Sequence, residues 1–139
     1  MRYMLDTNIC IYAMRTDNMN LNRRLGERQT GDLVMSTITL AELEAGFAKS
    51  VDPTGARQAA KAVLDAINVL PFDAAAARAF GRIQAVAPAR RGAYDRQIAA
   101  HAISLDLILV TNDENDFAGI PGLKVENWTE APTDGPSSR

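Results

Sequence analysis

The apolar run Leu107-Ile-Leu-Val110 limits the possible fold of this chain more than any other feature. Four consecutive apolar residues between polar neighbours are typical of a strand that is buried on both faces, as strands of parallel sheets are. A second short run, from Arg2 to Leu5, ends at Asp6, and a third covers Leu33 to Met35. Between these runs, apolar residues recur at helical spacing. Strands that alternate with helices predict an α/β fold, with a parallel sheet covered by helices on both faces.

Helical spacing and capping residues predict the remaining elements. Helices are expected from residue 7, over residues 20–29 and 39–49, after Asp52-Pro53, after Asp73, and from about 94 to 104. Further strands are expected over residues 68–72 and 123–126. The polar segment that follows Trp128 cannot bury enough apolar surface to order itself. We therefore expect one domain over residues 1–128 and a disordered tail over residues 129–139.

Size and composition exclude several protein classes. No stretch reaches the roughly 18 apolar residues that a membrane-spanning helix needs. The apolar start of the chain is interrupted by Asp6 and is too short for a secretory signal, so a cytoplasmic protein is the default expectation. The single cysteine, Cys10, cannot form an internal disulfide. It lies between two isoleucines and is expected to be a small buried residue.

The charge balance gives no direct sign of a nucleic-acid partner. The formal net charge is -2, whereas proteins that bind nucleic acids tend to be basic. Acids gathered at one metal site would, however, lower the total without making the rest of the surface acidic. The arginines come in groups, namely Arg23, Arg24 and Arg28, then Arg78 and Arg82, then Arg90, Arg91 and Arg96. Taken alone, such groups are typical of solvated helix faces.

Four acidic residues are placed so that the predicted sheet would bring them together. Asp6 and Asp113 each follow a predicted buried strand, and the carboxyl ends of parallel strands share one edge, where sites form. Glu42 lies one turn into a helix, and Asp95 opens the helix that leads into the run Leu107–Val110. Carboxylates at close range need a cation to stay ionised together, and all-oxygen ligation suits Mg²⁺ or Mn²⁺. Such an ion could activate water for phosphodiester cleavage.

Each of these acids also has a purely structural interpretation. Asp6 and Asp95 could cap their helices, and Asp113 could belong to a turn. The segment Thr39-Leu-Ala-Glu42 fits a capping box. The shared edge favours a site, because caps have no reason to gather at one edge of one sheet. The pattern alone predicts no more than an acidic cleft that could bind a metal.

Four segments, in order along the chain, carry a further signal. They are Met4-Leu-Asp-Thr-Asn8, then Ser36-Thr-Ile-Thr-Leu-Ala-Glu-Leu43, then Tyr94-Asp95 with Ile98-Ala-Ala-His-Ala102, and finally Leu109-Val-Thr-Asn-Asp113 with Asp116-Phe117 and Pro121 to Trp128. Together they resemble the motifs of the PIN-domain family, especially its VapC-type toxins. The likeness spans Met1 to about Trp128. It implies a three-layer α/β/α sandwich with a central, mainly parallel sheet, and an endoribonuclease toxin of a bacterial type II toxin–antitoxin pair.

The resemblance also assigns roles to single residues. The metal-binding and catalytic acids of the family correspond to Asp6, Glu42 and Asp95, with Asp113 as a more variable fourth. Whether Asp113 or Asp116 contributes more stays open. Glu44 is not the match, because the family glutamate precedes leucine, as Glu42 does, and Glu44 lies about 200° further round the helix. The polar groups expected to orient the ligands are Thr7, Asn8, Ser36 and Asn112.

The resemblance implies three partners for the chain. They are an RNA substrate, either transfer or ribosomal, a cognate VapB-like antitoxin that inhibits the toxin, and a second copy in a homodimer. Antitoxins of this family commonly insert a basic or apolar segment near the acids, and the candidate contact surface is around Ile11 to Leu25. Basic residues outside the cleft would guide the RNA backbone. Arg90-Arg91, which replaces a Pro-Ile type pair of many relatives, could add phosphate contacts.

Other functions stay open as alternatives. A Rossmann-like phosphatase would also place Asp6 after its first strand, but Asp6-Thr-Asn8 lacks the second Asp of such enzymes and no Gly-rich phosphate loop is present. A PIN-like module that binds RNA or a partner without cutting would be signalled by loss of an acid, and all four are present. An unrelated α/β protein would use the acids only as caps. His101 lies about 240° round the helix from Asp95 and is expected to be structural, and Trp128 is expected to pack the last strand.

Overall fold

The computed structural model describes residues 1–89 and 93–131, which form a five-stranded sheet with helices on both faces. The strands are β1 (Tyr3–Leu5), β2 (Leu33–Ser36), β3 (Asn68–Leu70), β4 (Ile108–Val110) and β5 (Lys124–Glu126). Their order across the sheet is β3-β2-β1-β4-β5, and every neighbouring pair is parallel. The predicted α/β fold is therefore confirmed, with the two apolar runs β1 and β4 side by side in its centre.

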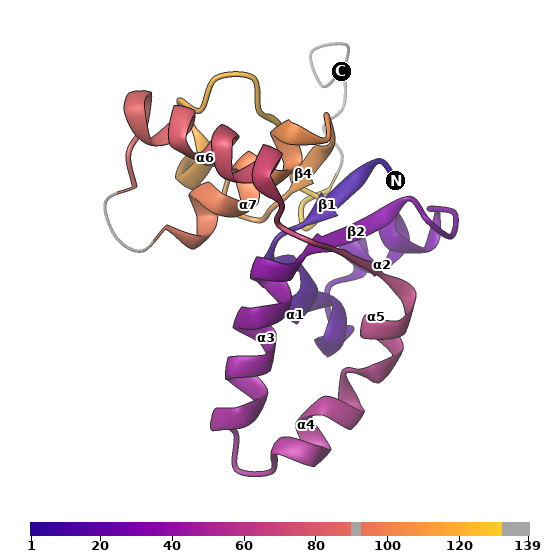
Figure 1. Ribbon diagram of the computed structural model, residues 1–139. Coiled ribbons are helices and arrows are strands. Elements are labelled where there is room, and N and C mark those ends of the chain that lie inside the picture. The colour runs from indigo at the N-terminus through magenta and orange to yellow at the C-terminus, as the bar shows by residue number, and fades with distance from the viewer. Residues whose placement is uncertain (90–92, 132–139) are drawn as a thin grey trace.

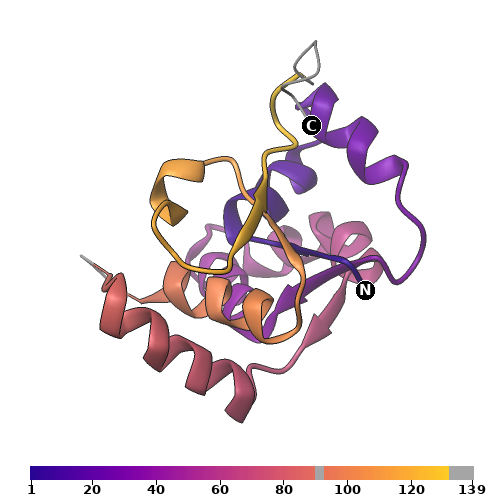
Figure 2. The same cartoon turned by 90° about the horizontal axis from the view of Figure 1, so that it is seen from above.

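Seven α-helices and one 3-10 helix connect the strands in the described residues. They are α1 (Thr7–Arg15), α2 (Met19–Gly26), α3 (Thr37–Lys49), α4 (Pro53–Ala59), α5 (Lys61–Ala66), α6 (Ala74–Val86), α7 (Tyr94–Ser104) and η1 (Glu114–Phe117). Helices α6 and α7 lie side by side, while α1, α3, α4 and α5 form a separate group on the other side of the strands (Figure 1). Seen from above, α6 and α2 lie at opposite sides of the molecule (Figure 2).

The sheet separates two apolar cores because its side chains alternate between faces. Tyr3 and Leu5 pack with residues of α1, α2, α3 and α5, whereas Met4 between them packs with residues of α6 and α7. In β4, Val110 lies in the first core and Leu109 in the second. Burying one such side chain stabilises the fold by ~2 kcal/mol relative to exposure. The three-layer α/β/α arrangement expected from the resemblance is thus confirmed.

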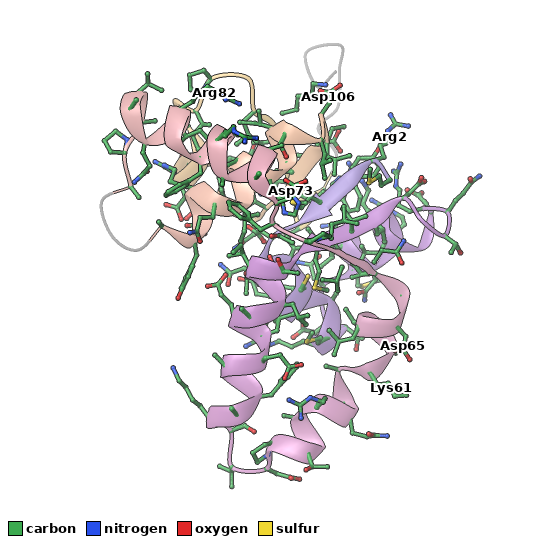
Figure 3. The ribbon with its side chains drawn as sticks, viewed as in Figure 1. Arg2, Lys61, Asp65, Asp73, Arg82 and Asp106 are labelled. Atoms are coloured by element: carbon green, nitrogen blue, oxygen red, sulfur yellow. The ribbon has the colours of Figure 1, made fainter. Side chains whose placement is uncertain are left out.

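Three helix predictions differ from the structure, the first of them α2, which ends at Gly26 and not at the expected residue 29. The helix expected after Asp52-Pro53 is two short helices, because the chain tightens at Ala60, whose amide bonds to the carbonyls of both Ala56 and Arg57. Ala60 is buried, while every residue of α4 and α5 keeps part of its surface exposed. On the outer side of α5, Lys61 and Asp65 form an exposed ion pair of 2.6 Å (Figure 3).

The start of α3 overturns the predicted capping box. Helix α3 begins at Thr37, and its cap is Ser36, whose hydroxyl accepts a hydrogen bond of 3.0 Å from the amide of Ile38. Thr39 is therefore a buried residue inside the helix, and the interpretation of Thr39-Leu-Ala-Glu42 as a capping box is wrong. The capping role that was the structural alternative to a site role for Glu42 is therefore removed.

An aromatic and arginine cluster joins the two ends of the domain. Trp128 is fully buried and meets Tyr3 edge-on, with ring centroids 4.8 Å apart. The guanidinium groups of Arg24 and Arg28 lie 5.4 and 5.2 Å from the Trp128 ring centroid, and Arg28 donates to the Tyr3 hydroxyl at 3.1 Å. The packing role expected for Trp128 is confirmed. For Arg24 and Arg28, the interpretation as a solvated helix face is wrong, because cation–π contacts hold both against the core.

Two sequence-based expectations fall on segments beyond the described residues. The phosphate contacts suggested for Arg90-Arg91, and the part of the predicted tail from residue 132 onward, lie outside the described ranges. Within those ranges, none of the helices combines the length and the apolar character needed to cross a membrane.

Candidate metal centre

Asp6 occupies the first position after β1, at the carboxyl edge of the sheet. Its side chain is 4% exposed and caps α1, since Oδ1 accepts a hydrogen bond of 2.9 Å from the amide of Ile9. Its own amide donates to the carbonyl of Val110 at 3.1 Å, which fixes Asp6 against the end of β4. The capping interpretation is therefore correct for Asp6. Capping uses one carboxylate oxygen and is compatible with a second role for the other.

Thr111, which the sequence analysis did not single out, lies opposite Asp6. Leu5 pairs with Val110 across the sheet, so the residues that follow them are neighbours. Thr111 is fully buried, its Oγ1 accepts a hydrogen bond of 3.1 Å from the amide of Asp113, and its side chain hydrogen-bonds to Asp6. One hydroxyl thus links the first acid to the fourth. A threonine directly after a buried strand, at the edge shared with Asp6, was the available signal.

The surroundings of Asp6 disfavour ionisation of its carboxyl group. Burial raises the pKa of Asp6 to about 6, and the charges of Asp95 and Glu42 raise it too, while hydrogen bonds from Thr111 and the amide of Ile9 act in the opposite direction. Asp95 and Glu42 are therefore close enough to disfavour ionisation of Asp6. A divalent cation between these groups would remove the repulsion.

Glu42 projects from the second turn of α3 and meets the first turn of α1. Its Oε1 accepts a hydrogen bond of 2.5 Å from the hydroxyl of Thr7, the residue after Asp6. Thr7 is one of the residues expected to orient the ligands, and this contact is of the kind expected. Glu44 instead pairs with Arg57 on α4. This contact agrees with the helical geometry that excluded Glu44 from the site.

Asp95 lies in the first turn of α7, where the partial positive charge of a helix N-terminus favours a carboxylate. The residue at the cap position is Ala93, so the interpretation of Asp95 as the cap of its helix is wrong. Partial burial raises the pKa of Asp95, the guanidinium of Arg96 lowers it, and the charge of Asp113 raises it. Asp95 therefore lies within electrostatic reach of both Asp6 and Asp113.

Asp113 and Asp116 occupy the turn that follows β4. Asp113 caps η1 and accepts a hydrogen bond of 3.4 Å from the amide of Asp116, so its interpretation as a turn residue is correct. Desolvation raises the pKa of Asp116, and the charge of Asp113, a hydrogen bond with Asp113 and the charge of Asp95 raise it further, while Arg96 lowers it. Both acids thus border Asp95 at the same edge.

The other residues expected to orient ligands make contacts elsewhere in the described structure. The hydroxyl of Ser36 lies 2.9 Å from Nδ1 of His101 as well as capping α3. Asn112 donates from Nδ2 to the hydroxyl of Tyr12 at 3.2 Å, and Asn8 is exposed. An orienting role for Ser36, Asn112 and Asn8 stays a prediction.

His101 is buried on the second face of the sheet and is structural, as expected. It is 1% exposed, its ring meets that of Phe72 edge-on at 5.6 Å, and burial lowers its pKa while the charge of Asp73 opposes this. A neutral, buried imidazole bonded to Ser36 braces α7 against the end of β2. It has no access to a substrate phosphate.

The donor set at this edge fits a hard divalent cation. Within the described residues, no three acidic, histidine or cysteine side chains are already arranged as ligands of one ion. The acids are nevertheless coupled electrostatically, and all of their donor atoms are carboxylate oxygens, which Mg²⁺ and Mn²⁺ prefer. The chemistry of these donor groups therefore fits such a cation, and their grouping as one site stays a prediction.

Comparison with known proteins identifies the same family along almost the whole chain. The model of the PIN domain matches residues 3–123. The chain is 38% identical, over 133 residues, to the tRNA(fMet)-specific endonuclease VapC of Shigella flexneri, covering 93% of this chain and 99% of that protein. Among solved structures, VapBC2 from Rickettsia felis bound to a promoter DNA fragment matches with a TM-score of 0.83 at 32% identity, covering 92% of this chain and 99% of the other. DNA-bound VapBC from Salmonella typhimurium matches with a TM-score of 0.84 at 34% identity, covering 92% and 98%.

Proposed function

Because the chain belongs to the PIN-domain family and, within it, to the VapC-type ribonucleases of toxin–antitoxin systems, we propose that it is a divalent-metal-dependent endoribonuclease. The observation that carries this proposal is the coupling of acids from four separate elements at the carboxyl edge of the sheet. If these acids served only as helix caps, nothing would require their carboxylates to lie near one another. A phosphatase and a non-cleaving module are the alternative functions.

Four carboxylates are proposed to hold the ion, directly or through water, with Mg²⁺ or Mn²⁺ as the metal. They are Asp6, Glu42, Asp95 and Asp113. When bound, the ion supplies a Lewis acid that activates water and stabilises charge on the scissile phosphate. Thr111 and Thr7 fix the carboxylates of Asp6 and Glu42 by hydrogen bonds, so these two ligands need little reorganisation.

A transfer RNA is the proposed substrate. The relatives from Shigella flexneri and Salmonella typhimurium are both described as tRNA(fMet)-specific endonucleases, and this chain covers nearly all of each. Tyr94, directly before Asp95, is 57% exposed and offers a ring on which an unpaired base can stack. The exposed Arg15 lies 6.0 Å from the Tyr12 ring centroid, and Tyr12 contacts Asn112 at the same edge, so Arg15 can meet the phosphate backbone there.

A VapB-like antitoxin is the proposed inhibitor, and a homodimer is the proposed form of the toxin. The similar solved structures from Rickettsia felis and Salmonella typhimurium are VapBC complexes. The proposed contact region, Ile11 to Leu25, includes Met19, which is 84% exposed on α2. The proposed location is the cytoplasm, where a chain that cuts transfer RNA would meet its substrate.

The experiment that tests this function is cleavage of an initiator transfer RNA by the purified chain freed of antitoxin. We expect cleavage with Mg²⁺ or Mn²⁺, none with EDTA, and a loss of at least about 100-fold in Asp95→Asn. Glu44→Gln is the matched control, because Glu44 pairs with Arg57 away from the site. An elongator transfer RNA tests selectivity. Intact RNA with a folded, metal-bound chain would favour the non-cleaving module, and hydrolysis of a small chromogenic phosphate would favour the phosphatase.

A further inference from the structure

Arg96 connects three segments that border the proposed metal site. It directly follows Asp95 in the first turn of α7. Its Nε donates a hydrogen bond of 3.0 Å to the carbonyl of Ala87, the C-cap residue of α6. Its Nη1 donates a bond of 2.6 Å to the carbonyl of Asp116 in η1. One guanidinium therefore ties the start of α7 to the end of α6 and to the turn that carries two acids.

The bond to Asp116 extends into the site through a chain of contacts. The amide of Asp116 donates to Oδ1 of Asp113 at 3.4 Å, and the amide of Asp113 donates to Oγ1 of Thr111 at 3.1 Å. Thr111 in turn bonds to Asp6. Arg96, the neighbour of Asp95 in the chain, is therefore connected through this turn to Thr111.

Among the described residues, few other side chains connect this turn to α7. Asp113 and Asp116 are both exposed, and η1 is only four residues long. Its apolar anchors are Phe117 and, just beyond η1, Ile120, which pack in the core shared with α6 and α7 and follow both acids in the chain. Arg96 also places a positive charge beside two carboxylates that would otherwise repel each other, Asp95 and Asp116. A planar group that donates in two directions is needed here, and lysine, a compact point charge, does not reproduce it.

We propose that Arg96 is a positioning residue that holds the turn Asp113–Asp116 against Asp95 and thereby raises the affinity of the site for its divalent cation. The inference rests on the proposed function, because it assumes that these acids bind the metal. The proposed role of Arg96 requires no contact with the ion or the RNA. It acts through the separation of acids that come from two different elements.

Mn²⁺ binding to the full chain without RNA, followed by electron paramagnetic resonance, is the test. We expect Arg96→Gln to weaken Mn²⁺ binding by about tenfold, as is usual when a group that orients ligands is lost. The Mn²⁺ affinity of Arg96→Lys should lie between those of Arg96→Gln and the wild type. The control is Arg82→Gln, since Arg82 is an exposed arginine on the side of α6 that faces away from α7 (Figure 3). In RNA cleavage, kcat of Arg96→Gln should fall and then recover at saturating Mn²⁺, with KM nearly unchanged.

Two results would overturn the role of Arg96. One is an Mn²⁺ affinity of Arg96→Gln equal to that of the wild type. The other is a loss confined to KM that varies with salt, which would make Arg96 a phosphate contact. If Arg96→Gln does not fold, as judged by circular dichroism, Arg96→Lys decides, and wild-type Mn²⁺ affinity in that variant refutes the proposal. A wild-type chain that binds no Mn²⁺ would refute the proposed function as well.

Discussion

The replacement Asp6→Asn should make the metal-free protein more stable at neutral pH. Burial and neighbouring acids raise the pKa of Asp6 from 3.8 to about 6, so ionising this carboxyl destabilises the fold. Each pKa unit corresponds to about 1.4 kcal/mol, so full ionisation of Asp6 lowers the free energy of unfolding by ~3 kcal/mol. Asparagine is neutral and caps helices as well as aspartate does, so the bond from Ile9 to position 6 can be kept.

The pH dependence of this effect has a definite sign. The folded state holds the Asp6 proton more tightly than the unfolded state, so the stabilising contribution is complete below pH 3.8 and is lost as the pH rises through about 6. The gain from Asp6→Asn should therefore be close to ~3 kcal/mol at pH 7.5 and should largely disappear near pH 4. For a domain of this size, the gain at pH 7.5 corresponds to roughly 5–10 °C in Tm.

Thermal and urea unfolding in EDTA, at pH 4.5 and pH 7.5, measure this difference. Asp52→Asn is the matched control, because Asp52 is an exposed cap that accepts from the amide of Gly55 at 3.1 Å. It should change stability by less than ~0.5 kcal/mol. Added Mg²⁺ should stabilise the wild type at pH 7.5 and stabilise Asp6→Asn much less. A variant that is less stable than the wild type at both pH values, by the same amount, would refute the electrostatic reasoning.

Three further changes probe neighbouring groups. Thr111→Val keeps the shape of the side chain but removes the hydroxyl that joins Asp6 to the amide of Asp113. The affinity for Mn²⁺ should therefore fall about tenfold while the fold is retained. An unchanged affinity in a titration would contradict this prediction. Burial lowers the pKa of His101, so the stability that this residue contributes is present above pH 6.5 and is lost as the pH falls. The loss of unfolding free energy caused by His101→Gln should therefore be smaller at pH 5 than at pH 7.5 in urea unfolding. An equal loss at both pH values would argue against a buried neutral imidazole. Tyr94→Ala should raise KM for transfer RNA roughly tenfold while Tyr94→Phe leaves it unchanged, and equal effects of the two would exclude base stacking.

The parts of the fold that follow from local periodicity could be predicted from the sequence. The runs Arg2–Leu5 and Leu107–Val110 are mostly apolar, which predicted buried strands, and both contain central strands of the sheet. The same reasoning predicts that Asp6 and Asp113, which follow two central parallel strands, lie at the carboxyl edge, and their role as site residues stays a prediction. The family resemblance then chose among the acids, as it did between Glu42 and Glu44.

What could not be predicted depends on contacts between distant segments. The cation–π contacts of Arg24 and Arg28 with Trp128 join residues about a hundred positions apart, and no local pattern signals them. The two bonds of Arg96 depend in the same way on where the ends of α6 and η1 come to lie. The cap of α3 could not be placed from the sequence, because Ser36 and Thr39 are both suitable capping residues.

Calorimetric titration of Mg²⁺ and Mn²⁺ into the antitoxin-free chain tests the central claim, that the acids of four elements form one cation site. We predict saturable binding by the wild type at pH 7.5, a loss of at least about tenfold in affinity for Glu42→Gln, and no change for Glu44→Gln, whose partner is Arg57. Glu42 and Glu44 lie on the same helix, and each variant removes one negative charge. A difference between the two variants therefore reports the position of the carboxylate and not the loss of a charge as such. Equal affinities in all three proteins, or no saturable binding by the wild type, would contradict the account.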